Sequence, residues 1–369
     1  MLIPGLLLVG WLVLVVQVFF LARYVLAFRL PPAPAPGETP PVSVVVCAHD
    51  EEENLRELVP LLLEQDYPEF ELIVVEDRCN DGTFDYLLEA TQRHPQLKMV
   101  RVKHLPDHIT GKKYAVTLGV KAAAHDWVLF TDADCRPVSR QWIRSMAGRM
   151  ASDKQIVVGY SPYLRERGYL NSFIRFESLL TGIQYLGSAL LGTPYMGTGR
   201  NLAYRKSLFL DNKGFHGHLS VTGGDDDLFV NRHARGANTA VAWGADSLMR
   251  SVPKRSWKSF LHQKLRHLSV GKRYRFRDRF RLGLFNLSWI LTWALVAPLM
   301  IQAEGLDNYL VLGFVARQGV LITLVHRASR KLGEPFEAWK TPPLDFQYAI
   351  YYLGTGLSAL VSKRIRWKN

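Results

Sequence analysis

The segment from Leu2 to Leu21 constrains the fold of this chain most strongly, because it contains no charged side chain. An α-helix of about 20 apolar residues has the length that crosses the hydrocarbon core of a bilayer. No basic segment precedes this run and no small-residue cleavage site follows it, which favours a retained span over a cleaved signal peptide. We therefore predict a transmembrane helix over residues 1–28.

Two further apolar runs lie towards the other end of the chain, at residues 282–303 and 306–325. Both are long enough to span a bilayer. The second contains Arg317 and Gln318 near its middle, so it must either face other helices or be tilted. A fourth segment, 343–362, begins with polar residues and is interrupted by glycines, so it could span the membrane, re-enter it or lie in its interface.

The net charge of +13 at pH 7 would suit a nucleic-acid partner, but the position of the basic residues favours a membrane. They gather beside the apolar runs, above all in the segment 256–281. Positive residues that flank spans mark the cytoplasmic side and attract anionic lipid headgroups. We therefore expect an integral protein of a bacterial-type inner membrane, with a cytoplasmic middle part and no nucleic-acid partner.

The polar middle part follows residues 29–41, whose many prolines predict a stiff, extended linker. Beyond the linker, buried-strand runs alternate with helical patterns. The strand-like runs are 42–47, 71–75, 98–102 and 127–130. Such alternation is typical of strand–helix–strand units, which build a parallel sheet through right-handed crossovers. We predict one α/β domain over residues 42–255, with a mostly parallel, Rossmann-like sheet and helices on both faces.

Two carboxylates, Asp132 and Asp134, come directly after the last of these strand-like runs. In an extended backbone the side chains of residues i and i+2 point the same way, here at the sheet edge where open α/β sheets bind ligands. Carboxylate oxygens suit Mg²⁺ or Mn²⁺, which proteins most often share with substrate phosphates. An Asp-x-Asp sequence is also common in turns and helix caps, so the pattern alone leaves both interpretations open.

Taken in order, these features resemble family 2 of the inverting glycosyltransferases, which have the GT-A fold and use nucleotide-sugar donors. The motifs that carry the resemblance are Val44–Asn54, Glu76-Asp77 with Asp81-Gly82-Thr83, Gly111-Lys112 and Asp132-Ala133-Asp134. The resemblance implies a donor, expected to be a UDP-sugar, that is bound by Cys47, His49, Glu51, Asp77, Lys112 and Asp132. It also implies a Mg²⁺ or Mn²⁺ ion on Asp134 and Asp132.

The block Gly223–Leu228 resembles the family's Glu-Asp-x-Asp-Leu motif. The match would make Asp225 the base that takes the proton of the acceptor hydroxyl. Gly224 stands where the family usually has Glu, which leaves Asp226 as a possible substitute for the base. The adjacent acids could instead cap a helix and complement its dipole.

The segment His262–His267 resembles the Gln-x-x-Arg-Trp motif of membrane-embedded polysaccharide synthases and ceramide glucosyltransferases. Gln263 and Arg266 are three residues apart and so lie on one face of a helix. The resemblance implies that they hold the donor diphosphate, which the planar fork of arginine suits. His267 stands where the family has Trp, which weakens the expected stacking at the acceptor. The segment could also be no more than part of the basic juxtamembrane collar.

The resemblance predicts a metal-dependent hexosyltransferase that moves a sugar, with inversion, to a lipid or lipid-linked glycan acceptor at the cytoplasmic membrane face. The small number of predicted spans favours a single transfer over a processive polysaccharide synthase. A catalytically silent nucleotide-binding protein is a further alternative. The segment from Tyr169 to Leu191 mixes apolar, aromatic and charged residues, so we expect an amphipathic interface helix that leads lipid acceptors to the site.

Overall fold

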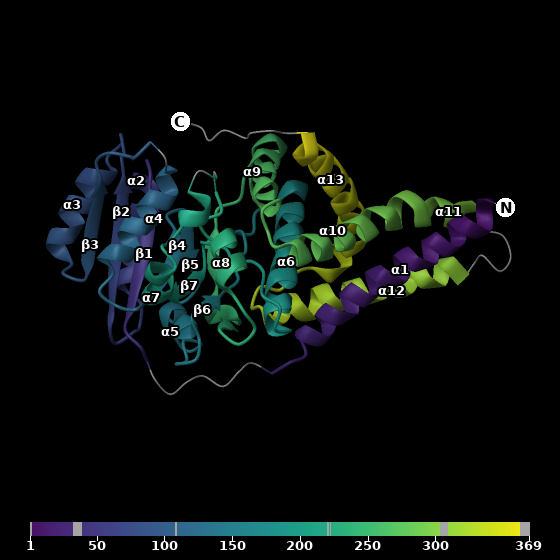
Figure 1. Cartoon of the computed structure of the whole chain (residues 1–369), viewed down its shortest axis with the longest axis horizontal. Coiled ribbons are helices and arrows are strands. Elements are labelled where there is room, and N and C mark those ends of the chain that lie inside the picture. Colours follow the sequence, from purple (N-terminus) through teal and green to yellow (C-terminus); the bar gives the residue numbers. More distant parts are fainter. Residues whose placement is uncertain are drawn as a thin grey trace. The chain divides into compact units, whose positions relative to one another are not determined.

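The computed structural model describes residues 2–31, 39–107, 109–219, 221, 223–302 and 309–361 (Figure 1). Most of the predicted proline-rich linker and the last residue of the predicted segment 343–362 lie outside these ranges. The chain divides into two compact units. The helical unit comprises Met1–Pro31, Glu166–Gly187 and Lys254–Ile365, and the sheet unit comprises Pro32–Arg165, Ser188–Pro253 and Arg366–Asn369.

The sheet unit is built on seven strands in the order β3-β2-β1-β4-β7-β6-β8. The strands are β1 (Val42–Ala48), β2 (Phe70–Asp77), β3 (Leu97–Val102), β4 (Trp127–Asp132), β6 (Ile156–Val158), β7 (Leu202–Arg205) and β8 (Thr239–Val241). Strands β1 to β4 pair in parallel, whereas β7 runs antiparallel to both of its neighbours. A second, two-stranded sheet joins β5 (Cys135–Pro137) to β9 (Met249–Ser251).

Helices cover both faces of the large sheet, because the strand residues are apolar on both sides. They are α2 (Glu52–Leu63), α3 (Thr83–Arg93), α4 (Gly111–Ala122), α5 (Trp142–Ala147), α7 (Lys206–Asp211) and α8 (Asp227–His233). One face of β1 packs with α2 and α5 in the main core. On the other face α4 comes so close that a Cβ on Gly119 would lie 2.6 Å from Val45. The predicted doubly wound α/β fold is confirmed.

The helical unit contains seven α-helices in the described part of the chain. They are α1 (Leu2–Ala27), α6 (Tyr169–Leu190), α9 (Trp257–Gly271), α10 (Phe276–Leu291), α11 (Ala297–Gln302), α12 (Tyr309–Lys331) and α13 (Thr341–Val361). Helices α10 and α11 are continuous through a π-helical turn at Thr292–Val296. Three stretches are long and apolar enough to cross a membrane, namely Gly5–Ala27, Phe276–Ile301 and Tyr309–Lys331. The prediction of membrane-spanning helices at both ends of the chain is confirmed.

Our expectation that the segment from Tyr169 to Leu191 forms an amphipathic interface helix was wrong. Helix α6 is buried along almost its whole length, including Arg175, Glu177 and Gln184. These polar side chains contact other parts of the same unit. Arg175 lies 3.3 Å from Glu334, and Glu177 forms an ion pair with Lys264 on α9.

A buried ion pair connects α12 to α13 inside the helical unit. Arg317 and Asp345 are both fully buried, and the guanidinium donates to both carboxylate oxygens. Gln318 adds a third hydrogen bond to Asp345, at 2.8 Å. Of the two alternatives for this segment, the structure thus shows the first, because Arg317 faces another helix.

Breaking this pair should destabilise the helical unit strongly. We expect Arg317→Leu to lower the free energy of unfolding by about 3–5 kcal/mol, because Asp345 is left as a buried charge without its partner. The double variant Arg317→Leu/Asp345→Leu should recover most of this loss. Unfolding of the full chain in mixed detergent micelles measures both effects. A single variant as stable as the parent would contradict the prediction.

Candidate active site

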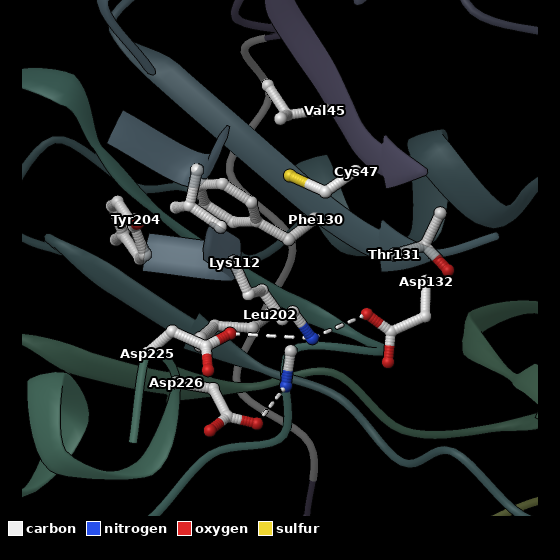
Figure 2. Close-up of a pocket in the computed structure, with 12 residues that line it drawn as sticks. Val45, Cys47, Lys112, Phe130, Thr131, Asp132, Leu202, Tyr204, Asp225 and Asp226 are labelled. Atoms are coloured by element: carbon white, nitrogen blue, oxygen red, sulfur yellow. Dashed lines mark hydrogen bonds and ion pairs between the residues drawn. The ribbon is translucent and has the colours of Figure 1, made fainter. Parts of the chain in front are cut away.

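A small cavity of about 20 Å³ lies where the carboxyl ends of β1 and β4 meet the first turn of α4. The residues around it include Cys47, Lys112, Asp132, Tyr204, Asp225 and Asp226 (Figure 2). They come from five different elements or loops and are up to 179 positions apart, counting from Cys47 to Asp226. The fold thus brings three of the predicted donor residues together with both candidates for the base.

Lys112 joins the predicted metal site to the predicted base. Its ammonium nitrogen lies 3.0 Å from Oδ1 of Asp132 and 3.4 Å from Oδ2 of Asp225 (Figure 2). Burial alone would lower the pKa of Lys112, but the charges of Asp132, Asp225 and Asp226 raise it well above its usual value. The lysine therefore keeps a fixed positive charge between the two acidic groups.

Asp225 and Asp226 are adjacent but have different surroundings. Asp226 caps α8, because its Oδ1 accepts the backbone N–H of Asp227 at 2.7 Å. Its Oδ2 accepts the N–H of Gly199, also at 2.7 Å. Burial and the charge of Asp225 raise the pKa of Asp226. The helix-cap interpretation thus holds for Asp226, whereas the Asp225 carboxylate points towards Lys112.

Lys113 and His218, which the sequence did not single out, hold the turn before Asp225. Gly223 and Gly224 both have left-handed backbones, with φ of 82° and 76°, which glycine adopts without strain. Lys113, almost fully buried, donates to the carbonyls of Val221 and Gly223. His218 donates through Nε2 to the Gly224 carbonyl at 3.1 Å, and burial lowers the pKa of this imidazole to about 4.

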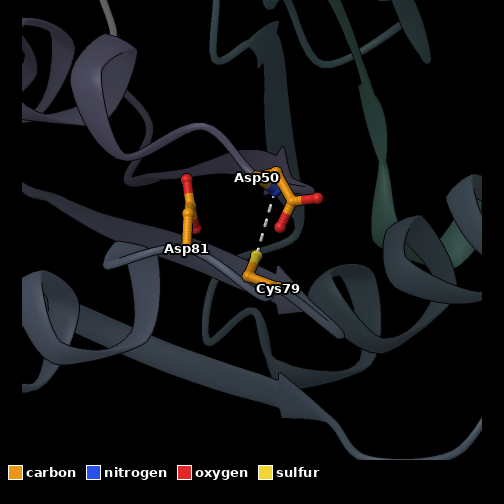
Figure 3. A group of neighbouring side chains, drawn as sticks. All are labelled: Asp50, Cys79 and Asp81. Atoms are coloured by element: carbon orange, nitrogen blue, oxygen red, sulfur yellow. Dashed lines mark hydrogen bonds between the residues drawn. The ribbon is translucent and has the colours of Figure 1, made fainter.

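A cluster of Asp50, Cys79 and Asp81 brings three potential metal-binding atoms within 4.8 Å of one another (Figure 3). The contacts of the cluster tie two loops together. Asp50 donates its N–H to the Cys79 sulfur at 3.3 Å, and Asp81 accepts the N–H of Glu52 at 3.1 Å. Burial raises the pKa of Cys79 to about 11, so the thiol is protonated at neutral pH.

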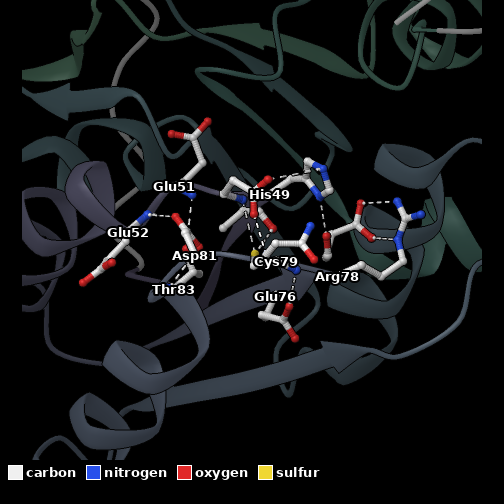
Figure 4. A network of polar contacts seen from close by, with 12 residues as sticks. His49, Glu51, Glu52, Glu76, Arg78, Cys79, Asp81 and Thr83 are labelled. Atoms are coloured by element: carbon white, nitrogen blue, oxygen red, sulfur yellow. Dashed lines mark hydrogen bonds and ion pairs between the residues drawn. The ribbon is translucent and has the colours of Figure 1, made fainter. Parts of the chain in front are cut away.

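The predicted nucleotide residues lie at the tips of β1 and β2 (Figure 4). His49 donates through Nδ1 to the Asp77 carbonyl at 2.5 Å, and the N–H of Glu51 donates to Thr83 at 3.1 Å. The Asp77 carboxylate accepts two hydrogen bonds from Arg78, at 2.8 and 3.4 Å. A Cβ on Gly111 would lie 2.7 Å from this guanidinium, so the arginine side chain would have to shift to admit a larger residue there.

The residues present fit a divalent metal ion. Asp132 and Asp134 are both partly exposed, one at the end of β4 and the other in the turn to β5. Their carboxylates are the hard oxygen ligands that Mg²⁺ and Mn²⁺ prefer. The thiol of Cys135, buried behind them, donates to Asp134 at 3.5 Å.

Arg200 is a second basic group near the metal candidates, and it lies in a glycine-rich stretch, residues 196–204. Its guanidinium carbon lies 4.7 Å from the centre of the Tyr163 ring. Burial alone would lower the pKa of Arg200, but Tyr163, Asp134 and Asp132 raise it. Its Nη1 is buried and has no hydrogen-bond partner among the described residues.

The predicted diphosphate residues Gln263, Arg266 and His267 all lie on α9 of the helical unit. The side-chain oxygen of Gln263 is buried and unpartnered among the described residues, whereas His267 is exposed. Lys264 anchors the same helix through its ion pair with Glu177. Contact of these residues with a donor stays a prediction.

The mostly parallel sheet with acids at its carboxyl edge defines a GT-A type fold. Residues 43–211 match the model of glycosyl transferase family 2. The chain is 31% identical over 146 residues to probable glycosyltransferase YdaM of Bacillus subtilis, covering 38% of this chain and 34% of that protein. It is 24% identical over 270 residues to glycosyltransferase AglE of Haloferax volcanii, covering 70% of this chain and 83% of that protein.

The fold is also that of a solved structure, the mannosyltransferase PcManGT of Pyrobaculum calidifontis in complex with GDP-Man and Mn²⁺. The two chains superpose with a TM-score of 0.64 over 98% of this chain and 100% of the other, at 18% identity. The match to YdaM covers about a third of the length of that protein. The predicted resemblance to family 2 is confirmed.

Proposed function

We propose that this chain is an inverting, metal-dependent glycosyltransferase that moves a sugar from a nucleotide-sugar donor to a lipid or lipid-linked acceptor. The observation that carries the proposal is the position of Lys112 between Asp132 and Asp225, at 3.0 and 3.4 Å. This contact unites a metal-binding acid, a cation suited to a diphosphate and a carboxylate able to act as a base. The Mn²⁺ and GDP-Man in the related mannosyltransferase support the same cofactor class here.

Each residue has a role that follows from its chemistry. Asp77 binds the base or ribose of the nucleotide, with His49, Glu51 and Cys47 beside it. Lys112 attracts the diphosphate, and Gln263, Arg266 and His267 contribute from α9. Asp134 and Asp132 would hold the Mg²⁺ or Mn²⁺ ion, which neutralises charge on the leaving nucleoside diphosphate. Asp225 takes the proton from the acceptor hydroxyl, whose oxygen displaces the diphosphate directly and inverts the sugar carbon.

The membrane part of the proposal rests on the helical unit. Three candidate spans and the basic residues beside them support an integral protein of a bacterial-type inner membrane, with the sheet unit on the cytoplasmic side. An acceptor anchored in the same membrane would then be concentrated at the site. The small number of candidate spans in the described residues favours the transfer of one sugar over the synthesis of a long polymer.

A donor screen tests this proposal. Membranes that contain the full chain are incubated with Mn²⁺, lipid extract and labelled UDP-glucose, UDP-N-acetylglucosamine or GDP-mannose. We expect one donor to be consumed with the appearance of a lipid that carries a single labelled sugar. A ladder of long polymer would contradict the transfer of a single sugar. Binding of nucleotide without turnover of any donor would contradict the proposal that the chain is an enzyme.

A further inference from the structure

Tyr204 is a buried tyrosine whose hydroxyl the reaction described above does not use. It lies on β7, and its ring packs against Phe130 and Phe229 at centroid distances of 4.6 Å each. The residue is 1% exposed, and its hydroxyl has no hydrogen-bond partner among the described residues. A buried hydroxyl without a partner destabilises a fold relative to phenylalanine, which would fill the same space. The core packing alone therefore gives no reason for a tyrosine here.

The same tyrosine borders the cavity beside the proposed base (Figure 2). The cavity has a volume of about 20 Å³, which is sufficient for one water molecule where polar groups surround that water. Asp225 and Lys112 supply such groups on one side, and Tyr204 is the remaining polar aromatic group. Burial, followed by the charges of Asp225, Cys47 and Asp226, raises the pKa of Tyr204 well above its usual value. The hydroxyl thus keeps its proton and can act as a donor.

We propose that Tyr204 is a positioning residue for the transfer reaction, whose hydroxyl donates through one water molecule in this cavity to the Asp225 carboxylate. This inference rests on the proposed function, because it requires Asp225 to be the base. The bridging water orients the carboxylate and stabilises its charged form before the acceptor arrives. The acceptor proton moves to Asp225, and Tyr204 keeps its own proton throughout.

Several of the other groups around Asp225 already have partners. The titratable and charged groups that face it are Lys112 of α4, Asp132 of β4, Cys47 of β1, Asp226 at the start of α8, Tyr204 of β7 and His218. Lys112 is shared with Asp132, and Asp226 already binds two backbone N–H groups. His218 donates to the Gly224 carbonyl. Thr131 and Tyr204 are the residues described around the cavity whose hydroxyls have no hydrogen-bond partner. Of the charges that act on Tyr204, that of Asp225 is the largest.

The variant Tyr204→Phe tests the inference, because it removes one oxygen atom and keeps the ring. The full chain in detergent is assayed with whichever of UDP-glucose, UDP-N-acetylglucosamine and GDP-mannose the parent protein consumes. We expect kcat to fall by about 5- to 30-fold, with the donor KM changed less than about twofold. The acidic limb of the kcat–pH profile should move up by about half a pH unit or more, because the carboxylate loses a donor to its charged form.

Tyr67→Phe is the matched control. The Tyr67 hydroxyl donates to the Pro40 carbonyl at 2.6 Å, away from the cavity, so this variant should melt at a lower temperature with an unchanged pH profile. An unchanged kcat–pH profile for Tyr204→Phe, whatever the melting temperature of the variant, would overturn the inference. It would show that the Tyr204 side chain serves only the packing of the core. That result, together with an inactive Asp225→Asn, would leave the proposed function intact. A fully active Asp225→Asn variant would instead contradict the proposed function, in which Asp225 is the base.

Discussion

Replacing Asp225 by asparagine should lower kcat by about 10²- to 10⁴-fold, which is the usual contribution of a positioned general base. The amide has nearly the same shape as the carboxylate and can still accept a hydrogen bond from Lys112, but it cannot take up a proton. The donor KM should therefore change little. Transfer assays with the full chain, at saturating donor, measure the effect.

Asp226→Asn is the comparison that separates the two neighbouring acids. Both oxygens of Asp226 accept backbone N–H groups, from Gly199 and Asp227, so this carboxylate serves the local fold. We expect it to lose stability of about 0.5–2 kcal/mol, as helix-cap changes do, and to retain much more activity than Asp225→Asn. If Asp226→Asn were the inactive variant and Asp225→Asn the active one, the two roles would have to be exchanged.

The predicted site residues that can be located from the local sequence are those at the carboxyl ends of strands. Asp77 ends β2 and Asp132 ends β4, while Cys47 belongs to β1. Apolar runs locate such strands from local sequence, and parallel strands place their carboxyl ends at one edge. The membrane-spanning helices were predictable for the same reason, since hydrophobicity and length are local properties.

The residues that the sequence did not reveal act through partners far along the chain. Lys113 binds carbonyls 108 and 110 positions away, and Glu177 pairs with Lys264 on another helix. The charges on α6 looked like those of a surface helix, because no local pattern shows that a distant helix will pair with them. Strand β7 has only four residues, too few for a periodic pattern to identify Tyr204 as a strand residue.

The metal hypothesis makes the second large prediction, which concerns Asp134 and Asp132. We expect Asp134→Asn to raise the Mn²⁺ concentration for half-maximal activity by at least about 100-fold, the upper end of what changes in outer-shell residues cost. Adding Mn²⁺ with UDP or GDP should raise the melting temperature of the parent protein through binding, and Asp134→Asn should abolish this rise. The melting assay gives a result that does not depend on turnover.

Asp153→Asn is the control for a change of charge, because Asp153 is a mostly exposed acid of the same unit that pairs with Lys154. It should leave the Mn²⁺ dependence unchanged. A parental Mn²⁺ response in Asp134→Asn would remove Asp134 from the metal site. It would then leave the loop acids Asp50 and Asp81 as the next oxygen ligands to test.

Asp132→Asn should have a broader effect than Asp134→Asn, because Asp132 is also a partner of Lys112 at 3.0 Å. Without the Asp132 charge, Lys112 is attracted only to Asp225 and Asp226, and a closer Lys112–Asp225 pair would hinder proton uptake by the base. We therefore expect Asp132→Asn to lower kcat even at saturating Mn²⁺, whereas Asp134→Asn recovers part of its activity there. Equal recovery of both variants at high Mn²⁺ would show that Lys112 does not couple the metal site to the base.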